Sequence, residues 1–254
     1  MMTQRKIALV TGGSRGLGRD MAINIAKKGL DVVITFHQNK IAADEVVEAI
    51  REEGAMGLAV QLDTRDTKSF DAFYQKLADQ LKVERGSTHF DYLVNNAGTG
   101  IYKPFSETTE EDFDDLMNIH FKGVYFFTQR ALPFLNDGGG IINISSGLAR
   151  FSFPGSSAYA SMKGAIEVFT RYLAKELGSR GINANVVAPG AVATDFGGGT
   201  NRDNEEKRKV ISSVTALGRV GEPEDIGGII AFLCTPDAHW MNAQRIEASG
   251  GTLI

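Results

Sequence analysis

The sequence has little cysteine and proline, no basic excess and no long apolar run. Its single cysteine, Cys234, permits no internal disulfide and no cysteine-rich metal site, so we expect no metal centre and a reducing, cytoplasmic location. The formal net charge of −4 argues against nucleic acid as a partner. No apolar run approaches the roughly 18 residues of a membrane span, and the opening MMTQRK is too short for a signal peptide. These absences predict a soluble globular protein that contacts neither membrane nor nucleic acid.

Short β-rich segments alternate along the chain with helical segments. The β-rich segments lie at 6–11, 31–36, 57–62, 90–95, 140–145, 182–188 and 245–248. Several are almost continuously apolar, as in strands that are covered on both faces. Between them, apolar residues recur at helical spacing, and the first helix should run from Gly16 to Lys28. The alternation predicts a doubly wound α/β fold with a parallel sheet, formed as one domain over residues 1–254.

Segment 195–213 differs in composition from the rest of the chain. It is polar, rich in glycine at its start and charged in its middle. This composition suits a mobile lid with a short helix, and it suits a plain surface insertion equally well.

A glycine-rich turn, TGGSRGLG at 11–18, separates the first expected strand from the first expected helix. Gly12, Gly16 and Gly18 permit a sharp turn and let a pyrophosphate approach the helix N-terminus. The spacing differs from the common dinucleotide fingerprint, and no P-loop lysine is present. A turn without a ligand is the alternative, although its place after the first strand favours a nucleotide.

Tyr159 and Lys163 are four residues apart, which places both on one face of a helix. An ammonium near a phenol favours the phenolate and lowers a pKa that is normally near 10. A general acid/base that acts on a carbonyl or an alcohol at neutral pH requires such a shift. An isolated pair of this kind is more often an ordinary surface pair. Ser146 strengthens the catalytic interpretation because it ends an expected strand, at the edge where doubly wound sheets bind ligands.

Together these segments resemble those of the short-chain dehydrogenase/reductase family. The matching motifs are the turn 11–18, Asp63, NNAG at 95–98, NISS at 143–146, YASMK at 159–163, PGAVAT at 189–194 and GRVGEPEDIG at 218–227. They follow the family's order over essentially the whole chain. The resemblance implies a Rossmann-like sheet of seven parallel strands, a nicotinamide cofactor and a homotetramer. It also implies a cofactor-binding core at 6–188 that holds the catalytic residues, a substrate lid at 195–213, and a last helix and strand at 218–254.

The same resemblance implies roles for single residues. Tyr159 would be the acid/base, Ser146 would orient the substrate carbonyl, and Lys163 would bind the nicotinamide ribose and lower the pKa of Tyr159. The other implied cofactor contacts are Gly12, Ser14, Arg15, Gly16, Leu17, Gly18, His37, Asp63, Thr64, Asn96, Ala97, Gly98, Pro189, Gly190, Val192 and Thr194.

Two positions depart from the family pattern. The family usually has a catalytic Asn three residues before a glycine, and counting back from Gly123 reaches His120, with Asn118 two residues earlier. Two positions differ by about 200° on a helix, so these side chains cannot replace each other. We expect His120 to support a proton relay from Lys163 to solvent; a core histidine beside an unused Asn118 is the alternative. The second departure is the bulky segment 147–151 after Ser146, which predicts a distinct substrate pocket.

Charge near the end of the second expected strand bears on the cofactor. Segment 34–40, ITFHQNK, contains no acid that would bind the ribose hydroxyls of NAD. Arg15 could instead meet the 2′-phosphate of NADP, unless it is merely a solvated turn residue. The sequence therefore favours NADP(H) over NAD(H).

The sequence predicts an oxidoreductase that transfers a hydride between NADP(H) and a small-molecule ketone or secondary alcohol. A 3-oxoacyl-thioester reductase is one alternative. The expected loop 136–140 offers no positive charge to an acyl carrier, although Arg171 and Arg180 lie on the following helix. A cofactor-sensing binding protein without catalysis is a second alternative, disfavoured by the intact Ser146, Tyr159 and Lys163. An epimerase or dehydratase would need a longer chain.

Overall fold

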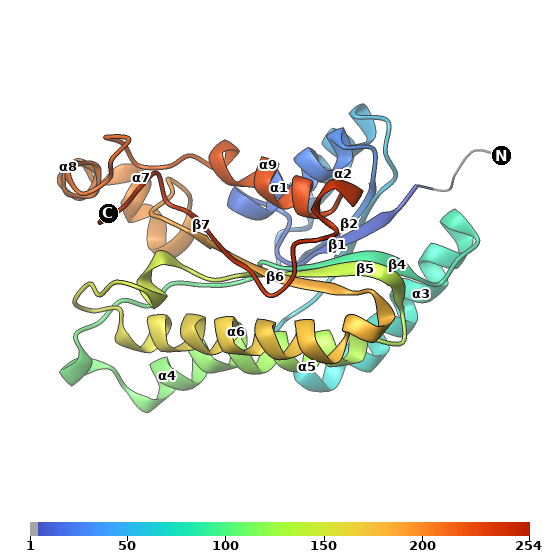
Figure 1. Ribbon diagram of the computed structural model, residues 1–254, viewed down its shortest axis with the longest axis horizontal. Helices are drawn as coiled ribbons and strands as arrows, with labels where there is room; N and C mark the ends of the chain where they lie inside the picture. Colours follow the sequence, from blue (N-terminus) through green and yellow to red (C-terminus); the bar gives the residue numbers. More distant parts are fainter. Residues whose placement is uncertain (1–4) are drawn as a thin grey trace.

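The computed structural model describes residues 5–254, so residues 1–4 of the predicted domain lie outside the described part. Seven parallel strands form one sheet in the order β3-β2-β1-β4-β5-β6-β7 (Figure 1). The strands are β1 (Ile7–Val10), β2 (Asp31–Phe36), β3 (Gly57–Gln61), β4 (Phe90–Asn95), β5 (Leu135–Ile144), β6 (Asn183–Pro189) and β7 (Arg245–Ala248). The order reverses between β1 and β4, and such a switch point opens a crevice at the carboxyl ends of the strands.

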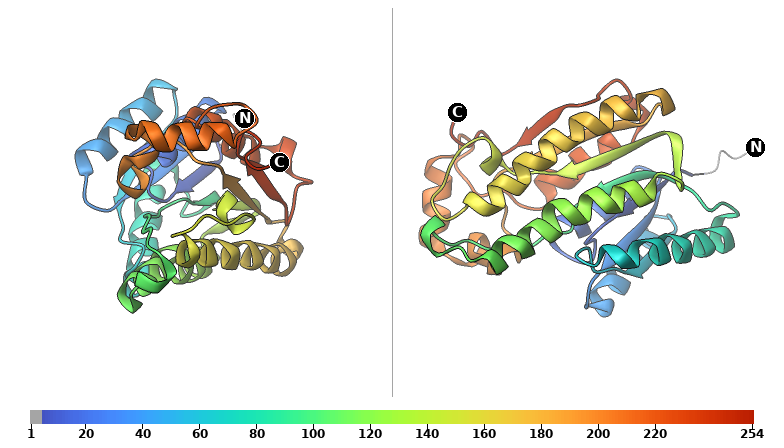
Figure 2. Two further views of the ribbon diagram at one scale, coloured as in Figure 1. Left: turned by 90° about the vertical axis from the view of Figure 1, so that its left-hand side faces the viewer. Right: turned by 90° about the horizontal axis from the view of Figure 1, so that it is seen from below.

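Helices cover both faces of this sheet. They are α1 (Gly16–Lys27), α2 (Lys40–Glu52), α3 (Phe70–Arg85), α4 (Glu110–Met117), α5 (Gly123–Ala131), α6 (Ser157–Glu176), α7 (Thr200–Asp203), α8 (Glu205–Ser213) and α9 (Glu224–Leu233). Helices α1, α2 and α9 lie on one face, and α3, α5 and α6 lie side by side on the other (Figure 2). The carboxyl ends of the strands, α7, α8 and the C-terminus share one end of the molecule, at the left of Figure 1.

Two apolar cores hold the layers together. Met21 and Ile25 of α1 pack with Ile230 of α9 on one face of the sheet. On the other face, Phe70 and Tyr74 of α3 pack against Phe127 of α5, and the Tyr74 hydroxyl donates to the carbonyl of Phe127. Because both faces are covered, the central strands β1 and β2 are buried along their whole length, as their sequences indicated. The doubly wound parallel sheet is thereby confirmed.

The observed strand ends agree with the predicted ones within one residue, except at β5. This strand begins at Leu135 and not at 140, because Leu135 pairs with Phe90 before the register shifts between Phe90 and Tyr92. The interpretation of 136–140 as a loop is therefore wrong. Those residues lie in the amino-terminal half of β5, away from the crevice. Arg180 lies in the turn after α6, not on that helix, where it pairs with Asp137.

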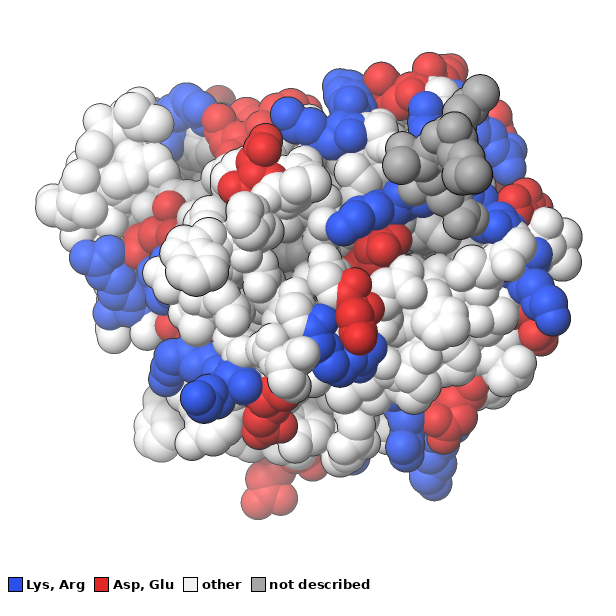
Figure 3. Space-filling model, turned by 45° about the vertical axis from the view of Figure 1, so that its right-hand side comes forward, with Lys and Arg blue, Asp and Glu red and all other residues white. Residues whose placement is uncertain are grey.

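Side chains of both charges are interspersed on the face shown in Figure 3, without a patch of basic residues that would follow a phosphate backbone. Within residues 5–254, the helices are all too short or too polar to cross a membrane.

Candidate active site

A cavity of about 780 Å³ opens at the carboxyl edge of the sheet, a size usual for small-molecule sites. The catalytic candidates Ser146, Tyr159, Lys163 and His120 all line it. So do the predicted cofactor contacts in the glycine turn, after β2, β3 and β4, and in segment 189–194. Asn118 does not line it. A second, more open hollow beside α3 contains none of the predicted site residues.

The glycine turn joins β1 to α1 with positive φ at Gly12 (+64°) and Gly16 (+52°). A Cβ on Gly18 would lie 2.2 Å from the carbonyl oxygen of Gly12, so the turn closes only because this residue has no side chain. Helix α1 begins without a side-chain cap and without an acid in its first turn. Its first amides therefore point into the cavity without side-chain partners and suit an anion.

The segment after β4 is tied to this turn. Asn96 Nδ2 donates to the carbonyls of Thr11 and Gly12, and the Thr11 hydroxyl accepts from the amides of Asn96 and Ala97 at 3.0 Å each. A Cβ on Gly12 would lie 2.9 Å from Ala97 Cα. The two segments can form a common wall only because a glycine occupies position 12.

Charges at this end of the cavity are distributed unevenly. Strand β2 ends without an acid, and within residues 5–254 no carboxylate pairs with the exposed Arg15. Asp63 lies 3.1 Å from Arg65 and 3.4 Å from His37. Burial acts to raise the pKa of Asp63, but hydrogen bonds from Arg65 outweigh it and the pKa is lowered. Asp63 is thus compensated, whereas Arg15 is available to a ligand.

Tyr159 and Lys163 lie on the buried side of α6, with the lysine ammonium 5.6 Å from the centre of the phenol ring. Lys163 Nζ donates to the carbonyl of Ile144 at 2.7 Å. Burial lowers the pKa of Lys163 to about 7. Burial, with a smaller effect of Tyr102, raises the pKa of Tyr159, and the Ser146 hydroxyl only partly opposes this. The chain alone therefore does not show the lowered pKa expected for Tyr159, because burial dominates.

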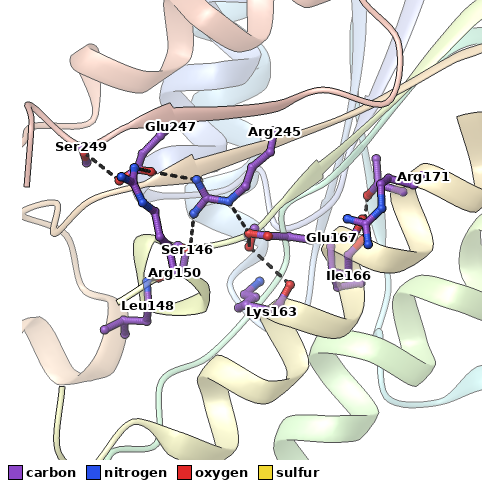
Figure 4. A network of polar contacts seen from close by, with 12 residues as sticks. Ser146, Leu148, Arg150, Lys163, Ile166, Glu167, Arg171, Arg245, Glu247 and Ser249 are labelled. Atoms are coloured by element: carbon purple, nitrogen blue, oxygen red, sulfur yellow. Dashed lines mark hydrogen bonds and ion pairs between the residues drawn. The ribbon is translucent and has the colours of Figure 1, made fainter. Parts of the chain in front are cut away.

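Ion pairs between β7 and α6 hold the segment around Ser146 (Figure 4). Arg245 Nε contacts Glu167 Oε1 at 2.7 Å, and Arg245 Nη2 donates to the carbonyl of Ser146 at 3.4 Å. The same Glu167 carboxylate accepts from the hydroxyl of Ser145 at 2.7 Å. The network thus fixes the end of β5 against the helix that carries Tyr159 and Lys163.

The bulky segment after Ser146 divides between cavity and surface. Leu148 and Phe151 line the cavity. Arg150 is exposed and pairs with Glu247 of β7 at 2.8 Å (Figure 4). Only two of these bulky side chains can therefore shape a substrate pocket.

His120 lies in a π-helical turn, Asn118–Lys122, between α4 and α5, and is almost completely buried. Its Nε2 lies 2.6 Å from the carbonyl oxygen of Thr99, and its Nδ1 has no hydrogen-bond partner. A Cβ on Gly98 would lie 2.6 Å from the imidazole, so the glycine of the NNAG motif makes room for the ring. Burial, and then the charge of Lys163, lower the pKa of His120 well below its usual value. The imidazole is therefore neutral at physiological pH.

Whole-chain comparisons agree with this architecture. Residues 12–252 match a family model described as enoyl-(acyl carrier protein) reductase. The hydroxynaphthalene reductase-like protein Arp2 of Metarhizium brunneum is 36% identical, with 98% of this chain and 95% of that protein covered. A short-chain dehydrogenase/reductase from Serratia marcescens is 32% identical with a TM-score of 0.89, covering 99% of both chains. The chain belongs to the short-chain dehydrogenase/reductase family. The predicted family is thus confirmed, and the chain is an oxidoreductase of this type.

Another similar structure is landomycin C-6 ketoreductase LanV with bound NADP and rabelomycin. It is 38% identical to this short-chain dehydrogenase/reductase, with a TM-score of 0.89, 98% of this chain covered and 96% of that one.

Sequence reasoning did not identify Tyr102 and Phe153 as lining residues of the cavity, and it included Phe196 and Lys207 only as part of the expected lid 195–213. Tyr102, Phe153, Phe196 and Lys207 line the far end of the cavity together with Phe151. The Tyr102 and Phe196 rings lie 6.0 Å and 5.8 Å from the ring of Tyr159. These residues come from three separate loops and α8, and no local spacing relates them to one another. In this short-chain dehydrogenase/reductase, that end of the cavity is therefore assembled by tertiary contacts.

Proposed function

We propose that the protein is an NADP(H)-dependent reductase of ketones, acting in reverse on secondary alcohols, with Tyr159 as its acid/base. The observation that carries the proposal is the convergence of Ser146, Tyr159 and Lys163 on the cavity that also contains the glycine turn. LanV, a ketoreductase, and Arp2, a hydroxynaphthalene reductase-like protein, support the same reaction class.

The cofactor end of the cavity fits a dinucleotide that carries an extra phosphate. The uncapped start of α1 suits the pyrophosphate, and Arg15 suits a 2′-phosphate because no protein carboxylate within residues 5–254 neutralises it. The absence of an acid after β2 removes the group that would repel this phosphate. LanV, which has bound NADP, supports the same preference.

The side chains around Tyr159 are arranged for proton donation to a carbonyl oxygen. The raised pKa of Tyr159 keeps the phenol protonated at neutral pH, which is the form that donates in the reduction direction. The Ser146 hydroxyl orients the same oxygen. Lys163, whose pKa is about 7, returns a proton to Tyr159 after each turnover. Bound NADPH supplies the hydride.

His120 extends this proton path toward solvent. Its neutral ring touches Tyr159 and is close enough to Lys163 for the ammonium charge to lower its pKa. The unpartnered Nδ1 is an acceptor that can hold a water molecule. We therefore assign His120, and not Asn118, to the position of the usual family Asn.

The substrate end of the cavity favours an aromatic ketone. The rings of Tyr102, Phe151, Phe153 and Phe196 line it, and flat rings pack well against such walls. LanV has rabelomycin bound, and Arp2 is named after hydroxynaphthalene. Segment 195–213 contributes Phe196, Lys207, Val210 and Ile211 to the lining, so we propose that it acts as a lid.

A homotetramer and a cytoplasmic location complete the proposal. Tyr125 and Phe126 of α5 and Val168 and Tyr172 of α6 are exposed apolar side chains on adjacent helices, which suits burial against a second copy. The proposal of a reducing, cytoplasmic location rests on Cys234, which is a buried free thiol. Sedimentation or mass photometry of the purified protein measures the assembly directly.

Turnover of bicyclic aryl ketones with NADPH and NADH in parallel tests the function. The wild type should reduce them with NADPH preferred, and Tyr159→Phe should lower kcat by about 10² to 10⁴ while NADPH still binds. Undiminished turnover by Tyr159→Phe would exclude Tyr159 as the acid/base. Tight NADPH binding without turnover of any ketone would instead favour a cofactor-sensing protein.

A further inference from the structure

Lys207 places a positive charge in the substrate end of the cavity. It lies on α8, lines the cavity, and its Nζ is 5.6 Å from the centre of the Tyr102 ring. Within residues 5–254, the ammonium donates one hydrogen bond, to the Thr200 hydroxyl at 2.7 Å. An ammonium has three donors, so two of them are free to meet a ligand.

The other charges of the cavity are compensated or assigned elsewhere. Arg65 pairs with Asp63 and Asp115, and Asp195 pairs with Arg202. This leaves three lining cations without a carboxylate partner within residues 5–254: Arg15, Lys163 and Lys207. Arg15 lies at the cofactor end, and Lys163 lies beside the reacting centre. Lys207 is therefore the lining cation to which the proposed reaction and cofactor binding assign no role.

An aromatic wall connects Lys207 with the acid/base. Tyr102 contacts both, since its ring centre is 6.0 Å from that of Tyr159 and 5.6 Å from the Lys207 ammonium. Gly100 and Gly197 allow this close packing, because a Cβ on either would approach the Tyr102 ring to less than 3 Å, at 2.9 Å and 2.8 Å. A flat ketone whose carbonyl is at Tyr159 would thus extend along Tyr102 toward Lys207.

We propose that Lys207 binds a negatively charged oxygen, a phenolate or a carboxylate, at the end of an aromatic substrate remote from the ketone. The inference rests on the proposed ketone reduction and adds the chemical class of the substrate. Burial lowers the pKa of Lys207, which shows that its charge is partly desolvated and interacts more strongly with an anion than a surface lysine does.

A matched pair of substrates separates this role from packing. A tetralone that carries a ring carboxylate and the methyl ester of the same compound differ mainly in charge. Lys207→Met keeps the aliphatic stem over Tyr102 and removes the ammonium. It should lower kcat/KM for the acid about tenfold more than for the ester, a size expected for a charge-assisted hydrogen bond. Lys207→Arg should restore most of the preference.

Lys209→Met is the matched control, because Lys209 lies on the same helix but is exposed and outside the cavity lining. It should change neither substrate's kcat/KM. An equal loss of kcat/KM for acid and ester in Lys207→Met would show that Lys207 only supports the lid. No loss of kcat/KM for either substrate would also overturn the inference.

Equilibrium binding of the acid to the protein–NADPH complex distinguishes failure of the inference from failure of the proposed function. If neither ketone is reduced, the proposed function fails, and Lys207 is judged by binding alone. Weaker binding of the acid to Lys207→Met, with ester binding unchanged, would support the anion site even then. Equal binding to both proteins would contradict it.

Discussion

The imidazole of His120 meets the phenol ring of Tyr159 edge to face, with ring centres 5.1 Å apart and planes at 87°. The contact depends on Gly98, which leaves space for the imidazole, and on the carbonyl of Thr99, which accepts from Nε2. With Nε2 as the donor, Nδ1 is an acceptor without a partner in a buried position. This arrangement makes His120 the polar neighbour of the acid/base on the side of α5.

Substitutions at His120 and Asn118 separate the two interpretations of this helix. His120→Asn should retain most activity, because the amide can also accept and donate hydrogen bonds. His120→Leu should slow turnover with little change in NADPH affinity. Asn118→Ala should alter stability by only about 0.5 kcal/mol, because its side chain does not line the cavity. Steady-state kinetics measure turnover, and a titration with NADPH measures the affinity for the cofactor. If Asn118→Ala lost activity while His120→Leu kept normal activity, the assignment would be reversed.

The buried histidine also predicts a dependence of stability on pH. The pKa of His120 is lowered well below 6.5 in the folded protein. Below pH 6.5 the unfolded chain therefore binds a proton at this residue, whereas the folded protein does not. Below pH 6.5 the free energy of unfolding should therefore fall as the pH falls, by up to about 1.4 kcal/mol per pH unit from this group. Urea unfolding at several pH values measures the slope. His120→Asn should remove this contribution, and the same slope in both proteins would contradict the assignment.

Arg15 should decide the choice between the two nicotinamide cofactors. Arg15→Ala removes a cation that no carboxylate within residues 5–254 neutralises, so NADPH binding should weaken by about 1.5 to 3 kcal/mol. NADH lacks the 2′-phosphate, and its binding should change little. Fluorescence titration with both cofactors measures the difference. Arg19→Ala is the control, because Arg19 is exposed on α1 and lies outside the cavity lining. Equal losses of affinity for both cofactors in Arg15→Ala would exclude a phosphate contact.

The link between Arg245 and Glu167 should matter for both folding and turnover. Arg245→Met leaves the partly buried Glu167 carboxylate without its cation, which we expect to cost about 2 kcal/mol of unfolding free energy. Because Arg245 also contacts the carbonyl of Ser146, kcat should fall as well. Arg171→Met, exposed on the same helix as Glu167, should change unfolding by about 0.5 kcal/mol or less. Thermal unfolding and kcat for the two variants test this, and equal behaviour would show that the network has no positioning role.

The sequence by itself determined the layers of the fold and the central part of the site. Strand and helix periods depend on neighbouring residues, so the alternation of segments predicted the parallel sheet. The glycine turn and the Tyr159–Lys163 pair could be located for the same reason, because their spacing along one turn or one helix face is local.

Only the tertiary structure decided which side chains are desolvated and which distant segments meet. The pKa of Tyr159 is raised because α6 packs against the sheet and the loops close over it, and a spacing of four residues contains no measure of that burial. The start of β5 depends on pairing with β4, a contact between residues far apart in the chain. Lys207 and Tyr102 became neighbours for the same reason: their contact arises where separate loops fold over one cavity, and sequence periodicity reports only local geometry.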